Sequence, residues 1–227
     1  MRKMNQENVG TNRAAESRRK LMLAGMARFA EKGYSGASVR DIVGGLGCSV
    51  QAISLHFGSK EGLSVAIVEE LKKTFVLPAV SDSASITTDR AWRVSVKRFV
   101  SDLIELLGAK DEPNCYFAAL YRHESANLHA KTKTLHEEIM MPVFRRFEQL
   151  IALGVPGRDP SIVRLAALSL WNNVLAYALK HPEVLAADVP DGIDLRLFRE
   201  MTIDYMVEVG LSKLKFTQEN KEHSNDR

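Results

Sequence analysis

The chain has 227 residues, of which 45% are hydrophobic and 26% are charged. These proportions are close to those of an average globular protein, so they exclude disorder over most of the chain. The length allows one large domain or two small ones. The only cysteines are Cys48 and Cys115, which excludes a disulfide scaffold and favours a reducing compartment.

Targeting signals are absent from the sequence pattern. Residues 1–17 are polar and lack the apolar core of a signal peptide. The most apolar stretch, residues 165–179, includes Asn172 and Asn173 and is too short to cross ~30 Å of hydrocarbon. We therefore expect a cytoplasmic protein with no membrane partner.

The net charge of +3 is unevenly distributed along the chain. Residues 1–75 contain 12 Lys/Arg and 7 Asp/Glu, a net charge of +5, and the remainder carries −2. A basic N-terminal third favours a polyanionic partner such as nucleic acid. A solvated surface with a few additional lysines has the same signature.

Helical spacing of apolar residues extends over nearly the whole chain, and strand patterns are almost absent. We predict an all-α fold whose polar ends, residues 1–16 and 217–227, are mobile. The predicted helices span residues 17–32, 38–46, 49–55, 59–77, 88–107, 113–128, 135–153, 160–180 and 193–210.

Local signals predict where these helices begin and end. Gly33 is a stop after the first helix, because a residue without a Cβ adopts the left-handed conformation easily. N-caps are expected at Ser38 with Asp41 as a capping box, Ser49, Ser59, Thr134 with Glu137, and Asp159 before Pro160. Pro142 should kink helix 135–153. Residues 80–87 form a loop at the domain boundary, and residues 182–192 an irregular segment.

The helices at 38–46 and 49–55 are joined by Gly47 and Cys48, the pattern of a helix-turn-helix. The second helix of such a pair can enter the DNA major groove. Apolar side chains such as Ile42 and Ile53 would hold the pair together. The outward-facing residues would be Val50, Gln51, Ser54 and Leu55, and the phosphate partners Ser38, Arg40, His56, Ser59 and Lys60. The same pair also fits an ordinary helical core.

Three runs in this region, residues 29–34, 38–42 and 56–63, closely resemble the DNA-binding domain of the TetR/AcrR family of transcriptional regulators. The resemblance covers residues 17–71 without a gap. It implies a three-helix DNA-binding domain at residues 17–78 and a helical ligand-binding and dimerisation domain at 79–215. It further implies a homodimer that binds a palindromic operator in double-stranded DNA, most often a repressor released by a small-molecule effector.

By position, residues 49–56 correspond to the family's recognition helix. Val50, Gln51, Ala52 and Ser54 fall on base-facing positions, and Leu55, His56 and Lys60 on phosphate-facing or supporting positions. Ser38 matches the hydroxyl that caps the preceding helix. The chain departs from the family by having Ser54 and Leu55 where a Tyr is usual, and Ala52 where Thr or Ser is frequent. These departures predict fewer phosphate contacts and a different base preference.

The C-terminal half resembles one subgroup of the family's regulatory domains, the CerR-like one, through residues 121–124, 137–144 and 164–171. Its aromatic and methionine side chains fit either a packed core or an apolar ligand cavity. The ligand-binding candidates are Tyr116, Tyr121, Met140, Phe144, Trp171, Asn172 and Tyr177. Asn172 and its neighbour Asn173 fit a ligand contact or a dimer interface equally well. Helices 160–180 and 193–210 carry apolar faces wide enough for a core and an intersubunit bundle.

Other kinds of site are not supported. His123, His129 and His136 are too far apart on one helix to share a zinc ion. The glycines at 44–47 follow no strand and match no phosphate-loop fingerprint. Cys48 fits a buried turn residue, with a redox switch as the alternative. We predict no cofactor, no metal and no enzymatic activity. The competing hypotheses are an all-helical enzyme or carrier, and a regulator that binds DNA constitutively.

Overall fold

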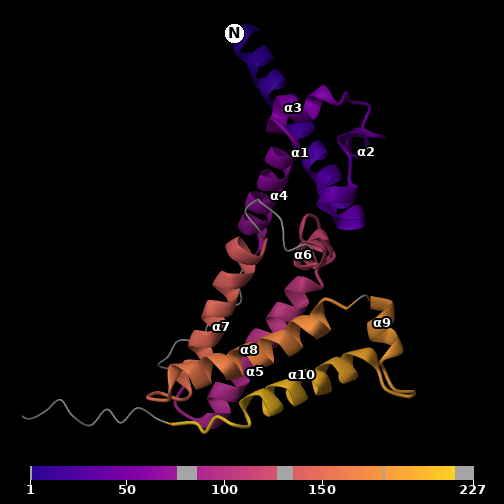
Figure 1. Ribbon diagram of the computed structural model, residues 1–227. Helices are drawn as coiled ribbons and strands as arrows, with labels where there is room; N and C mark the ends of the chain where they lie inside the picture. Colours follow the sequence, from indigo (N-terminus) through magenta and orange to yellow (C-terminus); the bar gives the residue numbers. More distant parts are fainter. Residues whose placement is uncertain (1, 76–85, 127–134, 181, 218–227) are drawn as a thin grey trace, which may run out of the picture. The chain divides into compact units, whose positions relative to one another are not determined.

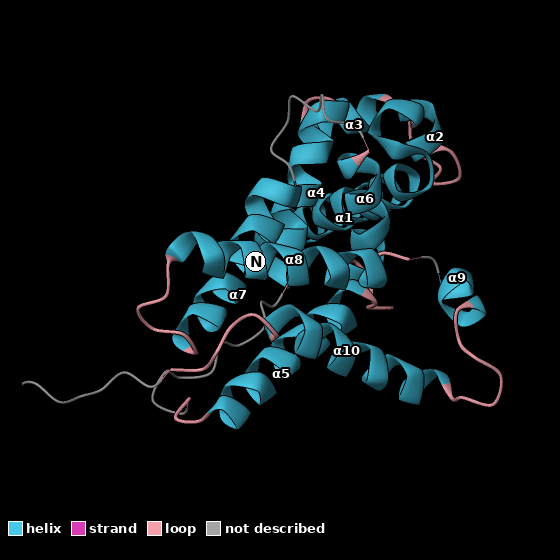
Figure 2. Cartoon of the chain, turned by 60° about the horizontal axis from the view of Figure 1, so that its bottom comes forward, coloured by secondary structure: helices cyan, strands magenta, loops and turns pink. Residues whose placement is uncertain are grey.

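The computed structural model describes residues 2–75, 86–126, 135–180 and 182–217. Every regular element in these ranges is a helix (Figures 1 and 2), which confirms the all-α prediction. None of the helices in the described ranges is long and apolar enough to cross a membrane.

The chain divides into two compact units. Unit 1 contains residues 1–76 and 109–140, and unit 2 contains residues 77–108 and 141–227. These units differ from the predicted domains 17–78 and 79–215, because the segment at 109–140 packs with the N-terminal helices. The predicted boundary loop lies largely within residues 76–85, outside the described residues. The division into functional domains stays a prediction.

Unit 1 is built around its first helix. Its helices are α1 (Arg2–Gly36), α2 (Val39–Val43), α3 (Gln51–Phe57), α4 (Lys60–Thr74) and α6 (Phe117–Ser125), with the short turns η2 (Asn114–Tyr116) and η3 (His136–Met140). Helix α1 packs against α2, α4 and α6. Its apolar face is buried, with Leu21 and Met26 at most 1% exposed. This face holds the short helices of the unit in place.

The first helix is longer than predicted. Residues 1–16 were expected to be mobile, but α1 begins at Arg2. Good helix formers such as Ala14 and Ala15 lie in this segment, and Glu16 forms an i,i+4 ion pair of 2.7 Å with Lys20. The stop at Gly33 is confirmed, since Gly33 has a positive φ of 71° that interrupts the helical backbone.

The predicted caps at Ser38 and Ser59 are confirmed. The Ser38 hydroxyl accepts a hydrogen bond from the Asp41 amide, and the Asp41 carboxylate accepts one from the Ser38 amide. The Ser59 hydroxyl accepts from the Gly62 amide at the start of α4. Helix α2 ends at Val43 rather than at residue 46, because Gly45 and Gly47 adopt positive φ angles in the turn that follows.

The segment that begins at residue 135 starts differently from the prediction. Thr134 lies outside the described residues, and the Glu124 carboxylate accepts hydrogen bonds from the amides of Leu135 and His136, each 2.9 Å. Instead of one α-helix to residue 153, a π-helical turn, His136–Met140, precedes Pro142. A proline has no N–H to continue the α-helical pattern, and a π turn accommodates the interruption.

Unit 2 contains α5 (Asp89–Leu107), α7 (Met141–Leu153), α8 (Pro160–Ala178), α9 (Pro182–Ala187) and α10 (Leu195–Leu211). Asp159 caps α8 as predicted, through a bond from the Ser161 amide. Helix α9 lies in the segment predicted to be irregular, so that prediction is wrong there. The predicted mobile tail is also wrong at Thr217, whose amide donates to the Gly154 carbonyl at 2.9 Å. Residues 218–227 lie outside the described residues.

The core of unit 2 is centred on Trp92 of α5, which is fully buried. Its indole N–H donates to the Leu150 carbonyl of α7 at 3.1 Å. The backbone of Gly154 lies against the same ring, and a Cβ at this position would overlap the indole. Helix α5 and the end of α7 therefore require a residue without a side chain at position 154.

Gly154→Ala should lower the free energy of unfolding by about 1–3 kcal/mol, the usual effect of overpacking a core. Urea denaturation followed by tryptophan fluorescence measures it. Gly36→Ala is the matched control, because a Cβ there meets only the Lys32 Cβ at an ordinary 3.4 Å. Equal midpoints for the two variants would contradict the assigned packing.

Asp41 should titrate with a pKa of about 2, because Ser38 donates hydrogen bonds to its carboxylate. Since this pKa is below the unfolded value of about 4, the capping box stabilises α2 above that pH and loses its effect as the pH falls towards 2. Carbon-detected NMR titration of the Asp41 carboxyl checks this. Ser38→Ala should raise the pKa, and the control Ser35→Ala should leave it unchanged. An unaltered pKa in Ser38→Ala would count against the capping box.

Candidate nucleic-acid interface

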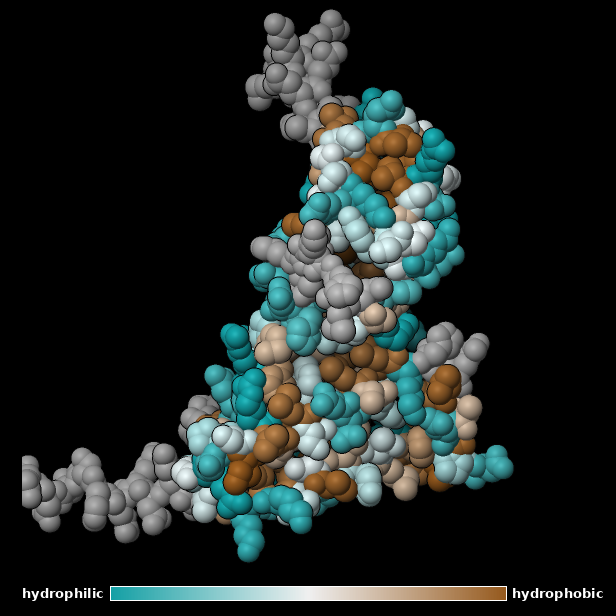
Figure 3. All heavy atoms as spheres, viewed as in Figure 1, coloured by the Kyte–Doolittle hydropathy of each residue, from teal (hydrophilic) through white to brown (hydrophobic). Residues whose placement is uncertain are grey.

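Helix α3 buries one residue and exposes half of the others. Ile53 is 1% exposed and anchors the helix, whereas Leu55 is 82% and Val50 44% exposed. Gln51 and Ser54 are also exposed, and Ala52 is half-buried. The outward face predicted from the sequence is therefore present as one surface, and the space-filling view shows apolar side chains at this end of unit 1 (Figure 3). An exposed Leu beside polar donors is suited to contact with base edges and thymine methyl groups.

The start of α3 differs from the prediction in one respect. Ser49 was expected to cap the helix, but the N-cap is Val50, and no side chain caps this end. Ser49 takes part through its backbone carbonyl, which accepts from the Ala52 amide at 3.0 Å. After the turn at residues 44–47, Ser49 lies one residue before the N-cap position of α3, so its hydroxyl does not cap the helix. Ser49 is exposed, and its role as a DNA contact stays a prediction.

The predicted phosphate partners have different surroundings. Arg40 is the second residue of α2 and is exposed. The Ser38 hydroxyl donates to the Asp41 carboxylate at 2.7 Å, so its proton is already engaged. His56 is half-buried beside Phe57, with ring centroids 6.3 Å apart. None of these three side chains is fully buried.

Lys60 is held by aromatic rings. Its ammonium lies 4.3 Å from the centroid of Tyr34 and 6.0 Å from that of Phe29. Partial burial lowers its pKa from the ordinary value. A cation stacked on aromatic rings keeps its charge while its position is restricted, so Lys60 is oriented at the first turn of α4, next to α3.

Sequence reasoning missed how α1 supports this surface. The Arg18 guanidinium lies 4.8 Å from the centroid of the Phe57 ring, at the end of α3. On the same helix, Arg13, Ser17 and Lys20 line a hollow whose other wall is formed by Leu46 and Cys48 of the turn before α3. The i, i+4, i+7 spacing of Arg13, Ser17 and Lys20 was the available signal, since such residues share one helix face.

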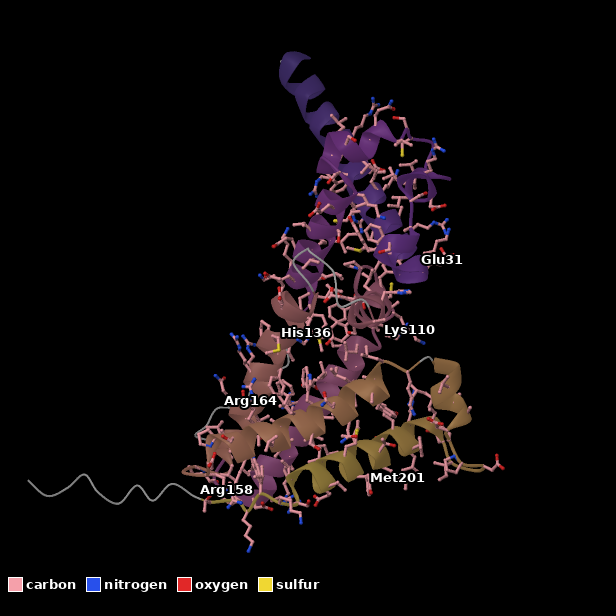
Figure 4. The ribbon with its side chains drawn as sticks, viewed as in Figure 1. Glu31, Lys110, His136, Arg158, Arg164 and Met201 are labelled. Atoms are coloured by element: carbon pink, nitrogen blue, oxygen red, sulfur yellow. The ribbon has the colours of Figure 1, made fainter. Side chains whose placement is uncertain are left out.

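The ligand-binding candidates do not form one group within either unit. Tyr116, Tyr121 and Met140 belong to unit 1, and the other four to unit 2. Tyr116 donates to Glu112 at 2.8 Å, which raises its pKa to about 12. The Tyr121 hydroxyl is 3.1 Å from Nδ1 of His136, the residue labelled in Figure 4.

The candidates of unit 2 are partly core and partly surface. The rings of Phe144 and Trp171 meet edge-on at 5.5 Å and are both buried. Tyr177 is half-buried and Asn172 is exposed. The exposure of Asn172 favours the second of its two interpretations, an interface, over a contact inside a ligand cavity.

His123 has a structural role in unit 1. The Nε2 atom of His123 donates to the Ala30 carbonyl at 3.1 Å. His129 lies outside the described residues. Across the described ranges, no three His, Cys, Asp or Glu side chains gather as metal ligands.

Comparison with known proteins agrees with this geometry. Residues 21–67 match the family described as bacterial regulatory proteins, tetR family. The chain is 26% identical over 192 residues to the HTH-type transcriptional dual regulator CecR of Shigella flexneri, covering 77% of this chain and 81% of CecR. That alignment is longer than residues 17–78, so it includes part of the C-terminal helices. The CerR-like subgroup stays a prediction.

Solved structures share the fold. A TetR transcriptional regulator from Agrobacterium tumefaciens has a TM-score of 0.59 at 15% identity, over 87% of this chain and 93% of that one. A transcriptional regulator from Rhodococcus sp. has a TM-score of 0.55 at 20% identity, over 86% and 96%. At these identities the likeness shows a shared fold. The helix-turn-helix with its exposed α3 thus lies in the segment, residues 21–67, that is similar to the tetR family of bacterial regulatory proteins.

Proposed function

We propose that the protein binds a palindromic operator as a homodimer and represses transcription until a small-molecule effector releases it. The observation that carries the proposal is the outward face of α3, where Gln51, Ser54 and Leu55 are exposed while Ile53 alone anchors the helix in the core. Such a helix has side chains available for DNA without any loss of packing. The dual regulation in the name of CecR belongs to that protein, and a reporter gene downstream of the operator would establish the sign of regulation here.

Base recognition would come from side chains near the start of α3. The Gln51 amide can donate to and accept from one adenine edge, and the apolar Val50 and Leu55 can contact thymine methyl groups. Ala52 and Ser54 leave room for close approach. Without the Tyr that the family usually has at position 54 or 55, phosphate binding would fall to Arg40 of α2, His56 near the end of α3 and Lys60 of α4, which offer positive charge or hydrogen-bond donors.

The homodimer would form through α8 and α10, which pack side by side in unit 2 (Figures 1 and 2). Exposed apolar residues are normal singly, but here they gather on two adjacent helices. Those with more than half of their surface exposed are Leu165, Leu195, Leu197, Met201, Tyr205 and Val209. Met201 is labelled in Figure 4. A two-fold axis through this face would form a four-helix bundle between subunits.

The effector would bind among the aromatic side chains of unit 2 that were predicted from the sequence, including Phe144 and Trp171. It can release DNA only if it binds more tightly to a conformer that fits the operator poorly. Loss of operator affinity on addition of candidate compounds tests this step. A regulator that binds DNA constitutively would retain full affinity with every compound.

Gln51→Ala should change which operator sequence is preferred, because it removes a base contact. Lys60→Ala should weaken binding to every duplex and reduce the slope of log affinity against log salt by about 1, because it removes a phosphate contact. Fluorescence anisotropy on the selected operator and on a random duplex measures both. Identical effects of the two substitutions on both duplexes would show that α3 does not read bases.

Leu165→Glu and Tyr205→Glu should convert the dimer to a monomer, because each places a charge in an apolar interface that must be dehydrated. Sedimentation velocity on the full chain measures the oligomeric state. Leu55→Glu is the control, since it places the same charge on an exposed apolar residue of α3. A dimer that survives both substitutions on α8 and α10 would place the interface elsewhere.

A further inference from the structure

Unit 1 contains a hollow of about 230 Å³ beside α3. One wall is a single face of α1, and the other is the turn that leads from α2 into α3. The lining residues are Arg13, Glu16, Ser17, Lys20, Leu21, Leu46 and Cys48. None of these positions was among the predicted DNA contacts.

The chemistry of the hollow suits an anion with a small apolar surround. Arg13, Ser17 and Lys20 present hydrogen-bond donors on three successive turns of α1, above the buried side chain of Leu21. Glu16 is the one acidic residue of the lining, and it is paired with Lys20 at 2.7 Å. Arg13 has no ion pair with the part of the chain that the structure describes. The hollow therefore has an excess of positive charge and a guanidinium available for a ligand.

The position of the hollow connects it to the DNA-facing surface. Leu46 and Cys48 lie in the turn immediately before Val50, the N-cap of α3. At the other end of α3, the Phe57 ring is covered by Arg18 of α1. The same stretch of α1 therefore meets the segments at both ends of α3, so an anion in the hollow would lie next to the helix that faces the bases.

We propose that the hollow receives one backbone phosphate of each operator half-site, bound by the Arg13 guanidinium, the Lys20 ammonium and the Ser17 hydroxyl. The inference rests on the proposed function, in which α3 meets DNA. Arginine and lysine are the usual partners of backbone phosphates, which set the register of the protein on the duplex. When the phosphate binds, the Lys20 ammonium leaves its ion pair with Glu16 and contacts the phosphate instead. The Glu16 carboxylate then opposes binding, because it repels the phosphate charge.

The first test uses charge neutralisation on the full-length chain. Arg13→Gln with Lys20→Gln should weaken binding to operator and random duplex alike, by about tenfold or more at low salt, because it removes two charge-assisted contacts to the phosphate. The slope of log affinity against log salt should fall by about 0.9 for each phosphate no longer neutralised. Arg28→Gln is the control, because Arg28 lies on the same helix and pairs with Glu31 at 2.6 Å. Circular dichroism confirms that each variant is folded.

Glu16 provides a test with the opposite sign. Glu16→Gln should tighten binding several-fold, because it removes a negative charge from the phosphate site and frees Lys20. Glu31→Gln changes the net charge equally, but Glu31 lies ~22 Å further along α1 at 1.5 Å per residue. It is labelled in Figure 4. A hollow that faces away from DNA would give both variants the same affinity.

The reactivity of the Cys48 thiol measures directly whether a phosphate occupies the hollow. Operator DNA should slow alkylation of Cys48 by iodoacetamide, measured peptide by peptide, while Cys115 on η2 serves as the internal control. Inorganic phosphate in place of DNA should give no protection. Protection of Cys48 by inorganic phosphate and not by DNA would show a site for a free anion and overturn the proposal.

The outcomes separate the two levels of the hypothesis. If the unmodified chain binds no duplex, both the proposed function and the phosphate site are wrong. If the chain binds its operator with a preference that depends on Gln51, but Arg13→Gln with Lys20→Gln leaves the salt slope at the Arg28→Gln value, only the phosphate site is wrong.

Discussion

The close crossing of α1 and α4 is the constraint on which unit 1 depends. A Cβ on Gly25 would lie 2.8 Å from Cδ2 of Leu63, so the two helices approach as closely as a residue without a side chain allows. The contact also buries Leu21 and Met26 of α1. Because α4 begins directly after α3, the direction of α4 against α1 determines where α3 emerges from the unit.

This arrangement explains how a helix as short as α3 presents its side chains. Seven residues are too few for a stable isolated helix, and Ile53 is its only buried side chain. The C-terminal end of α3 is supported instead, by Arg18 over Phe57 and by the start of α4, where Lys60 lies over Tyr34. Support at this end leaves the outward side chains free of packing roles, which is what a surface that contacts base edges requires.

The sequence predicted those features whose physical cause is local. The caps at Ser38, Ser59 and Asp159 each involve hydrogen bonds within three residues, so residue type and spacing were enough. The outward face of α3 was predicted in the same way, from the period of the helix. Where the cause is distant, prediction failed: the carboxylate of Glu124 caps a segment 11 residues later, and no local pattern reveals it. The hollow and the ring under Lys60 likewise depend on segments that meet only in the folded chain.

At Gly33 the local prediction was correct, but it explained only one of the two roles of this residue. Its positive φ ends the regular part of α1, as the sequence indicated. In the fold, a Cβ at this position would lie 3.2 Å from Nδ1 of His123, whose other ring nitrogen donates to the Ala30 carbonyl in the last turn before the break. This hydrogen bond joins α6 to the last turn of α1 before the break. The break in α1 and the docking of α6 are thus one feature, and the same glycine makes both of them sterically possible.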